Sequence, residues 1–260
     1  MDFVNEFAAG LSGKVWGWPE VFPALVALLL VTGLIMTTTL RFIQMRRLKH
    51  SLDVIRGKYD DPSHDGDLSH FQALTTALSA TVGIGNIAGV ATALHYGGPG
   101  ALFWMWVTAV FGMALKYAEC TLAIKYRVIL PDGQASGGPM YYIEKGLGSG
   151  WKWLAVMFAV CAIISSFGSG NSIQAFTVAD QIRADLGVPT WITGLITASL
   201  VALVILGGIK RIGTVTSKLV PYMAVIYVTG GLVVLVMNIT SIPGVLNDIF
   251  TSAFRPAAQI

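Results

Sequence analysis

The fold of this chain is decided by the stretch ALSATVGIGNIAGVA, residues 77–91, where glycines and polar residues interrupt an apolar segment. Lipid offers no water to unpaired backbone groups, so each such group is costly within a membrane. Gly83, Gly85 and Gly89 lower the cost of non-helical backbone. A membrane helix that loses its regular turns here predicts a bound ion or solute that takes up the freed carbonyls and amides.

The composition predicts a membrane protein. Of the 260 residues, 54% are hydrophobic and only 12% are charged, which is about half the charged fraction of a soluble domain. Apolar segments long enough to cross roughly 30 Å of hydrocarbon recur along the sequence. The predicted fold class is an all-α polytopic membrane protein with six spans, at about 20–42, 69–95, 100–124, 151–179, 190–208 and 218–239.

Basic residues gather in alternate loops. The first, third and fifth connections contain most of them: Arg41, Arg46, Arg47, Lys49, Arg56, Lys58, Lys125, Arg127, Lys145, Lys152, Lys210, Arg211 and Lys218. By the positive-inside rule these loops are cytoplasmic and the N-terminus lies outside. The basic first loop is interpreted as a topogenic signal rather than a lipid-specific site. A net charge of +3 gives no indication of a nucleic-acid partner.

The polar residues of the interrupted segment have the chemistry of a binding site. Ser79, Thr81 and Asn86 supply side-chain oxygens beside the freed carbonyls, and hard cations such as sodium prefer oxygen ligands. A new half-helix is expected beyond the break, and its first amides would face an anionic group such as a substrate carboxylate. This combination is typical of a sodium-coupled amino-acid carrier.

The same glycines allow two other interpretations. Gly85 and Gly89 fit GxxxG, a packing motif between straight membrane helices, and the pattern alone leaves this interpretation open. Residues 83–88 also fit the dinucleotide fingerprint GxGxxA. No βαβ unit surrounds them, however, and the residues about twenty positions further on are apolar, so we exclude the dinucleotide interpretation.

Further polar residues lie within predicted spans. Phe167, Asn171 and Gln174 should share one helical face. Gln174 would either hydrogen-bond a substrate or join two helices, and Phe167 could shape a pocket. Lys116 and Glu119 are spaced i, i+3, which fits an ion pair within one helix or a cytoplasmic gating contact. The histidines lie in neither a triad nor an HExxH motif, so no enzyme is predicted.

The motifs together resemble the alanine or glycine:cation symporter family. The resemblance covers most of residues 70–240 and is carried by TVGIGNIAGVA (81–91), GPGALFWMW (98–106), KYAE (116–119) and GGPMYY (137–142). It implies a prokaryotic cell-membrane protein that imports alanine or glycine with sodium, or sometimes with protons. It also implies the LeuT-type fold, in which five helices are repeated with inverted topology, here preceded by one extra helix.

The resemblance also implies a division of the chain. Residues 1–68 would form the extra N-terminal helix and the basic cytoplasmic loop, and residues 69–240 the first five-helix repeat. Residues 241–260 would be an outer loop that leads to a second repeat. The chain is thus expected to be the N-terminal portion of a longer protein and not to transport by itself.

By similarity to the family, the interrupted segment and the fourth span supply the ligands. The implied substrate-binding residues are Thr81, Gly83, Ile84, Gly85, Asn86 and Gln174. The implied sodium ligands are Ser79, Thr81, Val82 and Asn86, with Lys116 and Glu119 as a candidate gate.

We therefore expect a secondary active symporter that imports a small neutral amino acid, alanine or glycine, with Na⁺ as the coupling ion and no covalent cofactor. Its partners would be the lipid bilayer, the amino acid and Na⁺. Two alternatives remain open at this point: a channel whose pore is lined by the glycine break, and a membrane module that binds a solute without moving it.

Overall fold

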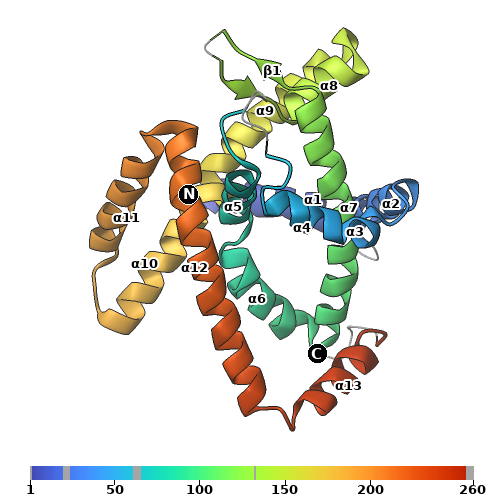
Figure 1. Cartoon of the computed structure of the whole chain (residues 1–260). Helices are drawn as coiled ribbons and strands as arrows, with labels where there is room; N and C mark the ends of the chain where they lie inside the picture. The colour runs from blue at the N-terminus through green and yellow to red at the C-terminus, as the bar shows by residue number, and fades with distance from the viewer. Residues whose placement is uncertain (1, 20–23, 61–65, 132, 256–260) are drawn as a thin grey trace. The chain divides into compact units, whose positions relative to one another are not determined.

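The computed structural model describes residues 2–19, 24–60, 66–131 and 133–255. Within these ranges the chain is almost entirely helical (Figure 1). A short antiparallel hairpin joins β1 (Val128–Ile129) to β2 (Ala135–Ser136), with Val128 opposite Ser136. The chain forms two compact units, residues 1–49 with 104–121, and residues 50–103 with 122–260.

The first unit contains α1 (Asp2–Gly17), α2 (Ala24–Thr39), α3 (Ile43–Arg46) and the central part of α7 (Gly100–Lys125). Its buried residues include Gly33, Thr37 and Ala114. A Cβ added at Gly33 would lie 2.8 Å from the Cβ of Phe111. The absence of a side chain at Gly33 therefore allows α2 to approach α7 closely.

The second unit contains most of the helices and the interrupted segment. In it α5 packs against α12, α8 against α9, and α11 against both α10 and α12. Its helical segments are α4 (Leu48–Ile55), α5 (His70–Thr81), η1 (Ile84–Asn86), α6 (Ala88–Gly97), α8 (Pro139–Leu147), η2 (Ser149–Trp151), α9 (Lys152–Ser165), η3 (Ser166–Ser172), α10 (Ile173–Leu186), α11 (Thr190–Ile205), α12 (Gly208–Met237) and α13 (Ile242–Ser252).

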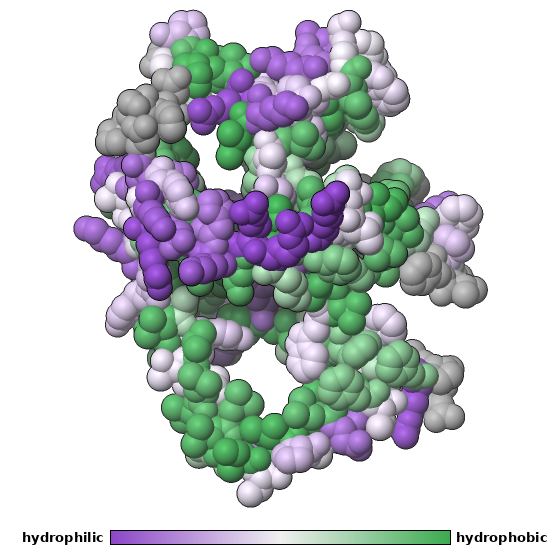
Figure 2. Space-filling view, turned by 45° about the vertical axis from the view of Figure 1, so that its right-hand side comes forward, coloured by the Kyte–Doolittle hydropathy of each residue, from purple (hydrophilic) through white to green (hydrophobic). Residues whose placement is uncertain are grey.

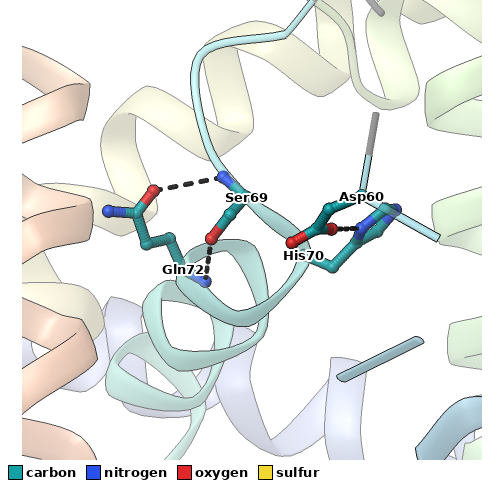
Figure 3. Close-up of polar contacts among 4 residues, drawn as sticks. All are labelled: Asp60, Ser69, His70 and Gln72. Carbon is teal, nitrogen blue, oxygen red and sulfur yellow. Dashed lines mark hydrogen bonds and ion pairs between the residues drawn. The ribbon is translucent and has the colours of Figure 1, made fainter. Parts of the chain in front are cut away.

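Helix α5 begins at a complete capping box (Figure 3). The Ser69 hydroxyl accepts a hydrogen bond from the Gln72 amide at 3.2 Å, and the Gln72 side chain accepts one from the Ser69 amide at 3.1 Å. The imidazole of His70 contacts the Asp60 carboxylate. Asp67 accepts a hydrogen bond from the Ala135 amide at 3.4 Å and lies 3.8 Å from the ammonium of Lys210. The start of α5 is thus fixed by local and long-range contacts.

The predicted membrane character is confirmed. In the part of the chain that the structure describes, three continuous helical segments, α7, Ser149–Leu186 and α12, are long and apolar enough to cross a membrane. Helices α5 and α6 form a fourth candidate if the bent pair counts as one span. Only 6% of the apolar window in each of the three is buried, so a protein core does not account for their composition. Large apolar areas lie at the surface (Figure 2).

Each of the six expected segments has a helical counterpart, although two of them, α2 and α11, are short. Residues 20–23, the expected start of the first span, lie outside the described residues. Helix α12 begins at Gly208, ten residues before the expected start at 218. The charges of Lys210, Arg211 and Lys218 lower the hydropathy there without ending the helix. The number of membrane crossings and the orientation of the N-terminus stay predictions.

Candidate functional site: the interrupted helix

The predicted break in the second apolar segment is confirmed. Helix α5 ends at Thr81, and Val82 and Gly83 continue in extended conformations. The turn η1 follows, and α6 starts at Ala88 with its axis bent by 68° from that of α5. Two separate half-helices therefore replace the single straight helix that the GxxxG interpretation requires.

Local hydrogen bonds explain where α5 ends. The Ser79 hydroxyl donates to the Thr76 carbonyl at 2.7 Å, and the Thr81 hydroxyl donates to the Ala77 carbonyl at 2.8 Å. Such bonds from side chain to backbone weaken a helix. The side-chain amide of Asn86 then donates to the Thr81 carbonyl at 3.1 Å and bridges the break. Asn86 therefore satisfies one of the last carbonyls of α5 without continuing the helix.

Gln174 from α10 reaches the break. Its side-chain oxygen accepts a hydrogen bond from the Ile84 amide at 3.0 Å. A Cβ added at Gly83 would lie 3.0 Å from Nε2 and 3.2 Å from Oε1 of Gln174, so glycine leaves room for this amide. The structure thus brings together Gly83, Ile84 and Gln174, three of the predicted substrate-binding residues. The Gln174 side chain is half-buried, whereas Ser79, Thr81, Val82, Gly85 and Asn86 are exposed.

Several main-chain groups at the break remain available. Among the described residues, none donates a hydrogen bond to the carbonyls of Ser79, Ala80 or Val82. On the other side of the break, the first amides of α6, from residues 88–90, donate to no described residue, and Ile87 provides no side-chain cap. Free carbonyls attract cations, and free helix N-terminal amides attract anions.

The fourth span differs from the sequence-based expectation. Residues 166–172 form a π-helix, which was not predicted. Phe167 is 75% exposed. Asn171 lines an apolar groove of about 410 Å³ between α10 and α11, with Ala175, Gly194, Thr197, Ala198, Val201, Ala202, Ile205 and Leu206. Asn171 therefore lines the groove beside α11, whereas Gln174 hydrogen-bonds the break. That Phe167, Asn171 and Gln174 share one helical face stays a prediction.

A π-helix has a wider turn than an α-helix, so it shifts side chains relative to the 3.6-residue period. The glycines and serines in the run SSFGSGNS are weak helix formers, and they are the feature of the sequence that indicates an irregular helix here.

Lys116 and Glu119 form the ion pair that their spacing predicts, with Nζ 3.1 Å from Oε2. The two side chains are 61% and 44% exposed and belong to one helix, α7. Their unit is not the one that contains the break. The pairing within one helix is thus confirmed, and the gating role stays a prediction.

One contact that holds α5 on the N-terminal side of the break was not predicted from the sequence. The hydroxyls of Thr76 and Thr216 lie 3.0 Å apart across the α5–α12 interface. Thr216 is 8% exposed, and the neighbouring Thr75 is 2% exposed. The only signal in the sequence was the presence of threonines within apolar segments.

An apolar chain of several spans, with an interrupted helix that frees main-chain carbonyls and amides, has the architecture of a membrane transport protein. The chain belongs to the sodium:alanine symporter family, whose family model matches residues 1–260. The resemblance to an alanine or glycine:cation symporter is therefore confirmed.

Curated relatives agree with this assignment. The chain is similar to the sodium/alanine symporter AgcS of Methanococcus maripaludis, with 51% identity over 99% of this chain and 56% of the relative. The putative sodium/proton-dependent alanine carrier protein YrbD of Bacillus subtilis is 42% identical over 96% of this chain and 49% of the relative. The probable sodium/glutamine symporter GlnT of Bacillus subtilis is 40% identical over 98% of this chain and 52% of the relative. The chain spans about half the length of these relatives.

Proposed function

We propose that this chain supplies the first half of a symporter that imports a small neutral amino acid together with Na⁺ by alternating access. The observation that carries the proposal is the pairing, at one break, of free carbonyls at the end of α5 with free amides at the start of α6. Carbonyl oxygens suit a cation and amides suit a carboxylate, and an amino acid carried with sodium presents both charges.

The carboxylate of the substrate would bind at the first turn of α6. The amides of residues 88–90 are free there, and the partial positive charge of a helix N-terminus favours an anion. Gln174 would orient the substrate, because Oε1 already accepts from Ile84 while Nε2 retains donor capacity beside Gly83. The backbone of Gly83, Ile84 and Gly85 would line the site.

Sodium would bind on the α5 side of the break. The carbonyls of Ser79 and Val82 accept no hydrogen bond from the described residues. Thr81 uses its hydroxyl hydrogen within α5, which leaves oxygen lone pairs for a cation. Asn86 donates through its Nδ2 and so retains Oδ1 as a ligand. All of these ligands are neutral oxygens, which suits a cation that must be released on the other side.

The substrate would be alanine or glycine. Small residues surround the break, namely Ala80, Gly83, Ala88 and Gly89. Relatives carry names that specify alanine in two cases and glutamine in another, so substrate size is the property to measure. A membrane potential of about 100 mV acting on one sodium charge is worth roughly 2.3 kcal/mol, which supports about fiftyfold accumulation.

We also propose the wider architecture that the family resemblance implies. Residues 69–240 would form the first five-helix repeat of a LeuT-type fold, preceded by residues 1–68 and followed by the outer loop 241–260. The protein would lie in the cell membrane with its N-terminus outside, as the distribution of basic loops supports. Lys116 and Glu119 would contribute to a cytoplasmic gate.

The test is sodium-dependent binding of radiolabelled alanine to the intact natural protein, purified and reconstituted. Asn86→Ala and Gln174→Ala should each weaken binding by about five- to a hundredfold, because each removes a proposed ligand group, Oδ1 of Asn86 or Nε2 of Gln174. Asn171→Ala is the matched control, since it removes an amide that lines the groove with α11 instead of contacting the break. Alanine counterflow in proteoliposomes then measures transport.

The outcomes separate the alternatives. Saturable binding with counterflow supports the symporter. Non-saturable alanine flux that does not depend on sodium would indicate a channel, and binding without counterflow would indicate a module that does not transport. If both break variants bind alanine as tightly as the parent protein, the proposed site is wrong.

A further inference from the structure

The corner between α2 and α3 has an unusual backbone. Arg41 and Phe42 are consecutive residues with left-handed φ angles of 52° and 55°, and among the described residues they are the only ones other than glycine with positive φ. Such angles are uncommon for side chains of this size. The corner is held by hydrogen bonds from the Phe42 amide to the Thr37 carbonyl at 2.8 Å and from the Arg46 amide to the Phe42 carbonyl at 3.1 Å. It is therefore a defined turn.

This geometry places apolar and basic side chains on the surface together. Phe42 is 54% exposed and Met45 is 64% exposed. The neighbouring Arg41, Arg46 and Arg47 are exposed as well. Nη1 of Arg46 donates to the Arg41 carbonyl at 3.4 Å, which ties one guanidinium to the turn.

No residue that the structure describes neutralises the positive charge of the corner. The sequence contains no Asp or Glu between Glu20 and Asp53. Arg41, Arg46 and Arg47 form no ion pair with any residue that the structure describes. Other cations are paired, including Lys152 with Glu144 at 3.2 Å and Arg183 with Asp180 at 2.8 Å. The corner therefore offers unneutralised guanidinium groups to an external anion.

We propose that this corner, residues 41–47, binds the phosphodiester headgroup of an anionic phospholipid. The apolar helix α2 ends at Thr39, so the corner follows directly after an apolar segment of the membrane protein. Guanidinium groups bind phosphate through forked hydrogen bonds. Phe42 and Met45 would enter the boundary between headgroups and acyl chains, as exposed apolar side chains of interfacial segments do. A purely topogenic signal needs the charges but neither the fixed turn nor the apolar pair.

The proposal can be tested on the intact natural protein with phosphatidylglycerol as the anionic lipid and phosphatidylcholine as the neutral one. Native mass spectrometry measures the affinity of the purified protein for each lipid. A basic residue near an anionic surface contributes about fivefold in affinity, so the double variant R46Q/R47Q, which removes two, should weaken phosphatidylglycerol binding about twenty-five-fold. The matched control is K145Q/K218Q, which removes two exposed positive charges elsewhere.

A second measurement does not depend on removing charges, which could alter insertion. A fluorophore is attached to Met45→Cys after Cys120 and Cys161, both exposed, are replaced by alanine. Spin-labelled phosphatidylglycerol should quench this fluorophore at least about threefold more strongly than spin-labelled phosphatidylcholine. The proposal is overturned if the two lipids quench equally, or if the two double variants lose phosphatidylglycerol affinity to the same extent.

Discussion

The two halves of the interrupted helix are held in very different ways. Helix α5 starts in a capping box, buries Thr75, and is joined to α12 by the hydrogen bond between Thr76 and Thr216. Helix α6 has no side-chain cap, and none of its described residues is buried. Just after the C-terminal end of α6, Gly100 lies against the backbone of α13. The comparison indicates that α5 is held over residues 69–76, whereas the close contact described for α6 lies at Gly100, just beyond its C-terminal end, and the N-terminal amides of α6 stay free of described partners.

The largest effect on stability is expected at Gly100, where the chain contacts α13 just after the end of α6. A Cβ at Gly100 would lie 2.6 Å from both the carbonyl carbon and oxygen of Ser252, and backbone cannot move as a flexible side chain can. Gly100→Ala should therefore lower the free energy of unfolding by about 2–3 kcal/mol. Thermal unfolding of the purified protein in detergent measures this change.

The control for this variant lies in the same helix. A Cβ at Gly112 meets no atom within 4 Å, so Gly112→Ala should be neutral or should raise stability by up to about 1 kcal/mol. Equal unfolding temperatures for the two variants would show that α6 is not anchored at Gly100.

A smaller effect is expected where α5 meets α12. Thr216→Val keeps the shape of the side chain but leaves the Thr76 hydroxyl without its partner, which should cost about 1–2 kcal/mol. Thermal unfolding again provides the measurement. Thr214→Val is the control, because the exposed hydroxyl of Thr214 bonds only within its own helix, to Lys210.

The double variant that changes Thr76 and Thr216 to Val sharpens this prediction. With both hydroxyls removed no donor is left unpaired, so part of the lost stability should return. If the two single effects simply add, the hydroxyls are not coupled and the α5–α12 contact rests on other packing.

The next-largest effect on stability is expected at the capping box of α5. Ser69→Ala removes the acceptor of the Gln72 amide and should cost about 1 kcal/mol. Hydrogen exchange in the first turn of α5 should accelerate while exchange in α6 is unchanged. Faster exchange in both half-helices would mean that they open together, which would contradict the comparison.

The sequence predicted the break for a physical reason that is local. Three glycines and several hydroxyl or amide side chains within residues 79–89 lower the cost of leaving the helix, and no distant residue is needed to see this. The ion pair between Lys116 and Glu119 was predictable in the same way from helical spacing.

Features that depend on distant residues or on subtle backbone geometry were not predicted. Thr76 and Thr216 lie 140 positions apart, and periodicity within one helix gives no partner in another. The π-helix at 166–172 differs from an α-helix by a small change of turn, for which the sequence offers only weak helix formers. Gln174 was expected to face a binding site, but its hydrogen bond to the Ile84 amide required the fold.

The smallest expected effect on stability is the most informative about function. Ile87 is the N-cap of α6, is 55% exposed and offers no hydrogen-bond acceptor from its side chain. Ile87→Ser would place a hydroxyl at this position. A shift of residue 87 from its αR conformation (φ −111°, ψ −74°) to the extended one that N-cap residues adopt would let this hydroxyl accept from the free amides of the first turn. Stability should rise by a few tenths of a kcal/mol to about 1 kcal/mol, as measured by thermal unfolding.

The same substitution should weaken sodium-dependent alanine binding severalfold, because the new hydroxyl competes with the substrate carboxylate for those amides. Ala91→Ser is the control, since a hydroxyl one turn further on bonds back to its own helix and not to the first-turn amides. A stabilised Ile87→Ser protein that still binds alanine like the parent would mean that the free amides of α6 do not hold the carboxylate. The difference between the two half-helices would then be a matter of packing alone.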